Sequence, residues 1–374
     1  MPTIIPKRPE SKLLQSFFCP TLLSTPGYHI DEPDVRFRLD RNESPFDWPE
    51  TSKQRILQRV GQHNWNRYPH PFDEELTSLI ATYSDVPSSC VLVGPGSNFL
   101  LSLCLNAFNQ ARKGKLVIAQ PSFPLYESHC RYSGIPYETW KLNADFQYDT
   151  RDLPALSAGS LVIFASPNNP TGNVLPLAKL EALLQAHPDC YFLADEAYYE
   201  FAEEIYTPLL ARYANLLLIR TFSKALSSAA LRLGYLLASA ETLQEIRKLM
   251  VPYLIAPLTH EAIKEALTHE EMREFIQTCQ QTIRKERNSL FQFFTQELPN
   301  KPFEAWNSQA NFLLLRWQTP EQTQFWYDRF IHSGILLRNV SKGPGLARCL
   351  RLTIGNQSDN VHVKQTFCKI LREI

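Results

Sequence analysis

The chain has 374 residues, 44% of them hydrophobic and 20% charged, which is the balance of a soluble globular protein and long enough for a large and a smaller domain. Lysine plus arginine equals aspartate plus glutamate at 38 each, so no net charge draws it to nucleic acid or anionic lipid. The eight cysteines are scattered without metal-ligand spacing. Without a secretory signal or an apolar run approaching roughly 20 residues, we expect a cytoplasmic protein with no membrane contact and no bound metal.

The beginning of the chain is rich in proline and predicts an irregular arm, with one extended piece at residues 35–39. From residue 72 onward, short apolar runs alternate with helical stretches, which is typical of βαβ units. Runs with little polar alternation predict strands covered on both faces, at residues 91–93, 115–119, 161–165, 190–194, 215–220 and 231–238. Helical spacing predicts helices at residues 99–108 and 176–186.

The pattern changes after residue 255. Residues 261–298 predict one long helical stretch, followed by strands at 311–317, 335–338 and 349–354 and helices at 321–332 and 359–374. We therefore expect an α/β protein with a large cofactor-binding domain at residues 66–255. The smaller α+β domain would be built from both chain ends, residues 1–65, which include the arm, and residues 256–374.

Polar motifs follow five of the predicted strands, where an open parallel sheet collects its ligands. They are Gly-Pro-Gly-Ser-Asn (94–98), Gln-Pro-Ser-Phe (120–123), Ser-Pro-Asn-Asn-Pro-Thr-Gly (166–172), Asp-Glu-Ala-Tyr (195–198) and Thr-Phe-Ser-Lys (221–224). Each motif alone reads as an ordinary turn, helix cap or surface lysine. Their order and their common place at strand ends predict a shared site.

With these motifs the chain resembles the fold-type-I pyridoxal-phosphate enzymes of the class I and II aminotransferase superfamily. The resemblance extends from residue 38 to residue 355. Asn-Arg-Tyr-Pro at 66–69 and the early Leu-Asp-x-Asn-Glu at 39–43 are similar to the histidinol-phosphate aminotransferase branch. The resemblance implies a mostly parallel seven-stranded sheet between helices, pyridoxal 5'-phosphate as cofactor, and a transaminase.

The resemblance also implies the roles of residues around the cofactor ring. Lys224 would form a Schiff base with the cofactor and move the substrate proton. Asp195 would keep the ring nitrogen protonated, so that the ring can accept electrons. Asn169 and Tyr198 would donate to the ring 3-oxygen, and Phe123 would stack on the ring face.

The cofactor phosphate is a dianion that needs donors, and a helix N-terminus supplies them. By the resemblance, the phosphate ligands would be Gly96, Ser97, Asn98, Ser223 and Arg232. Tyr68 would reach the phosphate from a neighbouring subunit, which implies a homodimer with a shared active site.

The substrate side depends on arginine, because a guanidinium binds carboxylate or phosphate in bidentate fashion. Arg351 resembles the family's carboxylate-binding arginine, and Arg338 the arginine that holds the distal phosphate of histidinol phosphate. Since histidinol phosphate has no carboxylate, both would face its phosphate, and Tyr28 would line the same pocket. The predicted reaction is therefore amino transfer between L-histidinol phosphate and 2-oxoglutarate.

Other substrates and reactions remain open at this point. The loop reads Gly-Ser-Asn-Phe at 96–99 where the family has Gly-Ser-Asp-Glu, Ser44 replaces an asparagine of the branch, and residues 343–345 lengthen the loop between the two arginines. An aromatic or other amino acid is an alternative donor. A lyase resembling threonine-phosphate decarboxylases is an alternative reaction class. A regulator that senses the cofactor is disfavoured, because Leu39 and Asp40 come too early to leave room for a DNA-binding winged helix.

Overall fold

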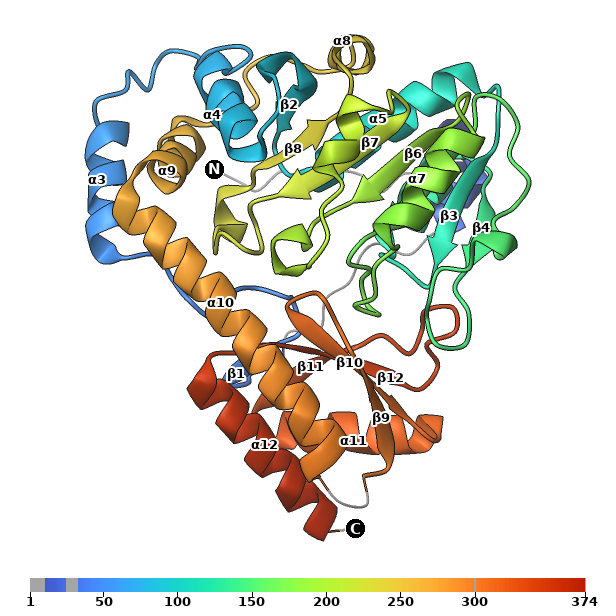
Figure 1. Cartoon of the computed structure of the whole chain (residues 1–374), viewed down its shortest axis with the longest axis vertical. Helices are drawn as coiled ribbons and strands as arrows, with labels where there is room; N and C mark the ends of the chain where they lie inside the picture. The colour runs from blue at the N-terminus through green and yellow to red at the C-terminus, as the bar shows by residue number, and fades with distance from the viewer. Residues whose placement is uncertain (1–10, 25–32, 299–300, 374) are drawn as a thin grey trace.

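The structure, a computed structural model, describes residues 11–24, 33–298 and 301–373 (Figure 1). Its larger sheet has seven strands in the order β2-β8-β7-β6-β5-β3-β4. The strands are β2 (Val91–Gly94), β3 (Leu116–Gln120), β4 (Glu138–Lys141), β5 (Leu161–Ala165), β6 (Tyr191–Asp195), β7 (Leu216–Thr221) and β8 (Gly234–Leu237). Five of them pair in parallel, and β8 runs antiparallel to both of its neighbours. The predicted mostly parallel seven-stranded sheet is confirmed.

Apart from the edge strand β4, the strands of this sheet are apolar on both faces, because helices cover both faces (Figure 1). Successive residues of a strand point to opposite sides, so Ile163 packs in one core cluster while Val162 and Phe164 pack in the other. The first cluster includes α5 (Ser97–Ala111), α6 (Leu125–Ser133) and α8 (Ala240–Arg247), and the second includes α4 (Glu74–Ser84) and α7 (Leu177–Ala186).

The second sheet has five strands in the order β1-β11-β12-β10-β9. They are β1 (Phe37–Leu39), β9 (Phe303–Trp306), β10 (Phe312–Trp317), β11 (Ile335–Asn339) and β12 (Cys349–Thr353). β1 pairs in parallel with β11, so a segment before the large sheet completes a sheet that follows it in the chain. The helices beside this sheet are α10 (Glu270–Gln292), α11 (Pro320–His332) and α12 (Gln357–Arg372) (Figure 1). The predicted smaller α+β unit from both chain ends is confirmed.

The remaining elements are short or connect the two sheets. α9 (Pro257–Thr268) precedes α10, and single helical turns lie at η1 (Ser88–Cys90), η2 (Thr150–Asp152), η3 (Tyr199–Phe201), η4 (Thr207–Ala211), η5 (Ala229–Leu231) and η6 (Phe293–Glu297). No helix in the described parts of the chain is long and apolar enough to cross a membrane.

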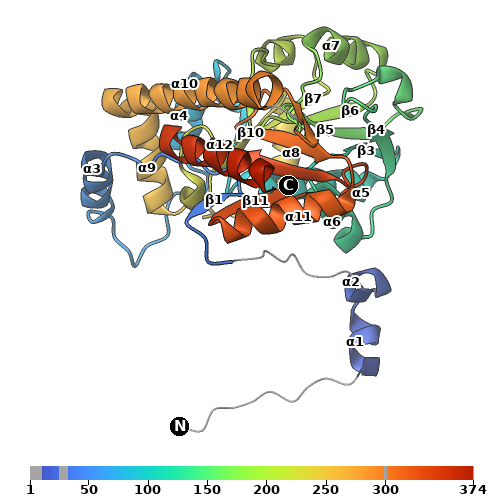
Figure 2. The ribbon, with the colours of Figure 1, turned by 90° about the horizontal axis from the view of Figure 1, so that it is seen from below.

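Three predictions about the elements were wrong. The N-terminal arm contains the helices α1 (Ser11–Phe17), α2 (Pro20–Ser24) and α3 (Glu50–Val60), and Figure 2 shows α1 and α2 standing away from both sheets. The edge strands β4 and β9 were missed, and the helical stretch after residue 261 is broken at His269. The sequence did not predict α3 because contacts with α9, which is distant in the chain, stabilise it. Arg59 Nε lies 2.9 Å from Glu261, and Arg59 Nη2 lies 2.8 Å from Glu265.

Candidate active site

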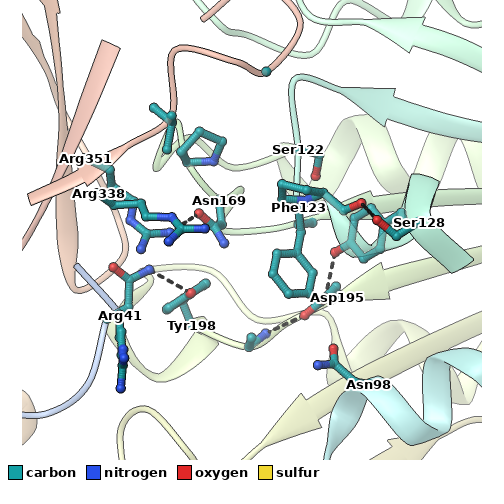
Figure 3. A pocket seen from close by; sticks show the side chains of 18 of the residues that line it. Arg41, Asn98, Ser122, Phe123, Ser128, Asn169, Asp195, Tyr198, Arg338 and Arg351 are labelled. Atoms are coloured by element: carbon teal, nitrogen blue, oxygen red, sulfur yellow. Dashed lines mark hydrogen bonds between the residues drawn. The ribbon is translucent and has the colours of Figure 1, made fainter. Parts of the chain in front are cut away.

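A cavity of about 750 Å³ lies between the two sheets, beyond the carboxyl ends of β3, β5, β6 and β7. Figure 3 shows Arg351 and Arg338 together at one end of the pocket, with Phe123 and Asp195 across from them. The predicted site residues that line the cavity are Ser97, Asn98, Phe123, Asn169, Asp195, Tyr198, Ser223, Lys224, Arg232, Arg338 and Arg351. Side chains from positions 97 to 351 therefore meet in one place.

Lys224 lies just after β7 with its amine in the cavity. Its Nζ donates a hydrogen bond to the backbone carbonyl of Arg41 at 3.0 Å. Burial lowers the pKa of Lys224 to about 8, and the neighbouring Arg351 and Arg232 cations act in the same direction. A lower pKa raises the neutral fraction of the amine at neutral pH by about two orders of magnitude. Lys224 is thus prepared to act as a nucleophile and as a proton carrier.

Asp195 ends β6, and both of its carboxylate oxygens have donors. Oδ1 accepts from the backbone N–H of Ala197 at 3.1 Å, and Oδ2 accepts from the Tyr126 hydroxyl at 2.7 Å. Burial raises the pKa of Asp195, while the bond from Tyr126 lowers it. A half-buried, oriented carboxylate of this kind suits a cationic N–H group on a ligand.

Hydrogen bonds occupy the acceptor oxygens of Asn169 and Tyr198, so that the amide N–H group of Asn169 and the hydroxyl proton of Tyr198 are available to a ligand. Arg351 Nη1 donates to Asn169 at 2.6 Å, and because a guanidinium only donates, the atom facing it is the oxygen of the amide. Asn42 Nδ2 donates to the Tyr198 hydroxyl oxygen at 2.9 Å, which leaves the Tyr198 proton for another acceptor. Burial raises the pKa of Tyr198, so the hydroxyl keeps that proton.

Glycine makes a close approach possible at the start of α5. Gly96 has a φ of +93°, and a Cβ there would lie 2.9 Å from Arg232 Nη2. A Cβ on Gly234 would lie 2.5 Å from the backbone nitrogen of Ser97. Arg232 Nη1 donates to Ser223 Oγ at 3.3 Å, which brings a guanidinium, a hydroxyl and a helix N-terminus together. This group of donors is suited to a phosphate dianion.

Arg351 and Arg338 are direct register partners on the antiparallel strands β12 and β11. Both line the cavity, and Arg351 is 7% exposed. Arg351 Nη2 donates to the backbone carbonyl of Asp40 at 2.5 Å, and its guanidinium lies 5.4 Å from the Phe312 ring centroid. The two adjacent guanidinium groups can bind one anion that carries two charges.

Two of the predicted residues that the structure describes, Gly96 and Tyr68, do not line this cavity. Gly96 lies behind Ser97 and acts through its conformation. Tyr68 is 82% exposed and stacks on Tyr253 with ring centroids 4.7 Å apart. Tyr28 lies outside the described residues.

The structure adds residues that the motifs did not reveal. Tyr126 contacts Asp195, Asn42 contacts Tyr198, and the backbone carbonyls of Asp40 and Arg41 hold Arg351 and Lys224. The segment 39–43 was noticed only as a mark of one branch of the family. Its position beside β1 could have indicated that it reaches the site.

The arrangement fits pyridoxal 5'-phosphate along its whole length. The cavity brings together phosphate donors, an amine of lowered pKa, an oriented carboxylate and the aromatic Phe123. The phosphate donors include the Arg232 cation, and Asp195 supplies the negative charge that a protonated ring nitrogen needs.

Comparison with known proteins agrees with this chemistry. The sequence profile of the family "Aminotransferase class I and II" matches residues 36–366. The histidinol-phosphate aminotransferase of Thermococcus gammatolerans is 32% identical over 350 residues, which cover 93% of this chain and 94% of the relative.

Solved structures share the fold. That of the histidinol-phosphate aminotransferase of Sinorhizobium meliloti in complex with pyridoxal-5'-phosphate superposes with a TM-score of 0.80 and 21% identity, covering 96% of this chain and 98% of that one. The structure of L-threonine-O-3-phosphate decarboxylase from Porphyromonas gingivalis superposes with a TM-score of 0.71 and 23% identity, covering 90% of this chain and 100% of that one. The profile match and the similarity to the Thermococcus relative show that this chain belongs to the class I and II aminotransferases and is a pyridoxal-phosphate-dependent enzyme.

Proposed function

We propose that this aminotransferase takes L-histidinol phosphate as its amino donor and 2-oxoglutarate as its acceptor. The observation that carries the proposal is the pair Arg338 and Arg351, adjacent on β11 and β12 and both facing the cavity that holds Lys224. Two guanidinium groups match a phosphate dianion better than a single carboxylate. The name of the Thermococcus relative supports the same donor.

The residues proposed to hold the cofactor are those that the family resemblance implies, and the position of most of them around one cavity supports the proposal. Pyridoxal 5'-phosphate, when bound, supplies a ring that stabilises negative charge at the substrate carbon that loses its proton. Asp195 would hold the protonated ring nitrogen, Phe123 would cover the ring face, and Asn169 and Tyr198 would donate to the ring oxygen. The residues proposed for the phosphate are Gly96, Ser97, Asn98, Ser223 and Arg232.

Lys224 would carry both the covalent link and the proton transfer. Its Nζ would form the link that holds the cofactor, and its free amine would accept the proton from the substrate carbon. The same amine would donate a proton on the cofactor side of the site. The lowered pKa of Lys224 suits both directions, since a catalytic pKa near the working pH lets the amine accept and donate.

The two half-reactions would use one anion site. The phosphate of the donor and the distal carboxylate of 2-oxoglutarate would bind in turn between Arg338 and Arg351. The backbone carbonyl of Asp40 holds Arg351 in place in both cases. Tyr28 is proposed as a further wall of this pocket.

The subunit arrangement, the domain division and the location are parts of the same proposal. We place an N-terminal arm and part of the small domain at residues 1–65, the large domain at 66–255 and the rest of the small domain at 256–374. Exposure of the large aromatic residues Tyr68 (82%) and Trp65 (81%) supports a homodimer in which Tyr68 reaches the partner's cofactor. The enzyme is proposed to work in the cytoplasm.

A spectral titration of the purified holoenzyme with candidate amines tests the substrate. Histidinol phosphate should convert the cofactor spectrum to that of its amino form at micromolar concentration, and 2-oxoglutarate should reverse the change. A response to aromatic amino acids with none to histidinol phosphate would overturn the proposed donor. Carbon dioxide release from threonine phosphate, with no amino transfer that depends on a keto acid, would instead indicate a decarboxylase.

A further inference from the structure

A buried tyrosine in the wall of the cofactor site, Tyr126, has no assigned function. Tyr126 is in the first turn of α6 and is fully buried, at 0% exposure. Its ring packs in the core cluster formed by α5, α6 and one face of the large sheet. A phenylalanine would fill the same space, so packing alone does not explain the hydroxyl.

A buried hydroxyl is costly unless it has a partner, and the partner of Tyr126 is Asp195. The hydroxyl donates to Asp195 Oδ2 at 2.7 Å, while the Ala197 N–H donates to Oδ1 at 3.1 Å. With one donor on each oxygen, the plane of the carboxylate is fixed. Oδ2 retains a second lone pair for a proton donor on a ligand.

The same side chain also supports the residue proposed to cover the cofactor ring. Phe123 and Tyr126 meet edge to face, with centroids 5.6 Å apart and planes at 84°. This is a favourable geometry for an aromatic pair. One buried side chain therefore contacts both the carboxylate and the aromatic residue of the proposed ring site.

The direction of the hydrogen bond is fixed by the charges around it. Burial raises the pKa of Tyr126 well above its usual value, so the hydroxyl remains a donor. Burial also raises the pKa of Asp195, and the bond from Tyr126 is the first of the effects that lower it, ahead of the Ala197 N–H. The other titratable groups that act on these two residues are Glu196, Lys224, Tyr148 and Tyr198.

We propose that Tyr126 is a positioning residue of the cofactor site, whose hydroxyl keeps the Asp195 carboxylate ionised and aimed at the cofactor ring nitrogen. The inference rests on the proposed pairing of Asp195 with that nitrogen. Without the hydroxyl, the pKa of Asp195 would rise, and its carboxylate would draw the proton away from the ring nitrogen more strongly. The ring would then carry less positive charge, and the nitrogen that links it to Lys224 would keep its own proton to higher pH.

The variant Tyr126→Phe tests the inference in the holoenzyme without any amine. Its matched control is Tyr148→Phe, because Tyr148 is also buried at 1% exposure and its hydroxyl donates to a backbone carbonyl, that of Ala165, at 2.5 Å. Each variant loses one buried hydrogen bond. A difference between the two variants therefore arises from the contact of the Tyr126 hydroxyl with Asp195, and not from the loss of a buried hydrogen bond in general.

Two measurements are made: the dissociation constant of pyridoxal 5'-phosphate, and the pH at which the visible absorbance of the bound cofactor titrates. Tyr126→Phe should weaken cofactor binding by about tenfold, as for a hydrogen bond to a charged group, and move the titration to higher pH. Tyr148→Phe should change neither.

Asp195→Ala separates the two levels of the argument. If it shifts both measurements while Tyr126→Phe matches the wild type, Tyr126 is a packing residue and the inference fails alone. If Asp195→Ala itself leaves both measurements unchanged, the proposed pairing with the ring nitrogen fails, and the role of Tyr126 fails with it.

Discussion

Replacing Arg338 by glutamine tests the proposed anion site with little risk to the fold. Arg338 is half-buried at the cavity wall, and no side-chain hydrogen bond or ion pair holds it among the residues that the structure describes. Its neighbour Arg351 remains in place through Asn169 and the carbonyl of Asp40. The variant therefore removes one of two cations that face the same anion.

The size of the effect follows from the partial exposure of Arg338. A hydrogen bond between charged groups contributes about 1.5–3 kcal/mol, and water access places this one near the lower end. A loss of about 1.5–2 kcal/mol corresponds to roughly 10- to 30-fold in kcat/KM for histidinol phosphate. The same variant should unfold within about 0.5 kcal/mol of the wild type, since no buried contact is lost.

A coupled assay of glutamate formation from histidinol phosphate and 2-oxoglutarate measures this ratio. Arg316→Gln is the matched control: Arg316 belongs to β10 of the same sheet, and its guanidinium lies 5.8 Å from the Trp306 ring centroid instead of in the cavity. Its kcat/KM should stay within about twofold of the wild type. A loss below threefold for Arg338→Gln, or an equal loss in both variants, would refute the two-arginine site.

Three further predictions concern the cofactor site and its support. Capture of pyridoxal 5'-phosphate by the apo-protein should speed up as pH rises through about 8, because only the neutral Lys224 amine attacks; Arg351→Gln removes a cation and should move this profile, followed by stopped-flow absorbance, to higher pH. Gly96→Val should weaken cofactor binding in equilibrium dialysis by at least tenfold, since its side chain would meet a phosphate-binding guanidinium at positive φ. Arg220→Ala should lower the free energy of unfolding by about 3–5 kcal/mol in urea titration, because it leaves the buried Glu196, now 2.7 Å from Arg220, without its counter-ion. An unchanged pH profile, an unchanged dissociation constant or a loss under about 1 kcal/mol would contradict the respective prediction.

The elements that could be predicted from the sequence are those with a distinct local pattern of apolar and polar residues. The runs behind β5, β6 and β7 are apolar without alternation because both faces of the sheet are covered, and polar motifs mark where they end. β4 and β9 lie at the edges of their sheets, and several of their residues are exposed to water. Their sequences therefore contain polar residues and no continuous apolar run. Pattern alone cannot separate such segments from loops.

Long-range contacts explain what was missed in the site. Tyr126 and Asp195 are 69 residues apart in the chain, and Asn42 and Tyr198 are 156 apart, so no local window joins them. The strand-end motifs revealed the residues that contact ligand directly, whereas their supports became visible only in three dimensions. α3 was missed for the same reason, since its ion pairs are with α9.

The covalent attachment of the cofactor to Lys224 can be measured directly. Borohydride treatment of the coloured holoenzyme fixes that bond, and mass spectrometry of the peptides then locates the added pyridoxyl group. The account predicts a single modified lysine, within the Thr-Phe-Ser-Lys turn after β7. A pyridoxyl group on a different lysine, or a protein that binds no cofactor at millimolar concentration, would contradict it.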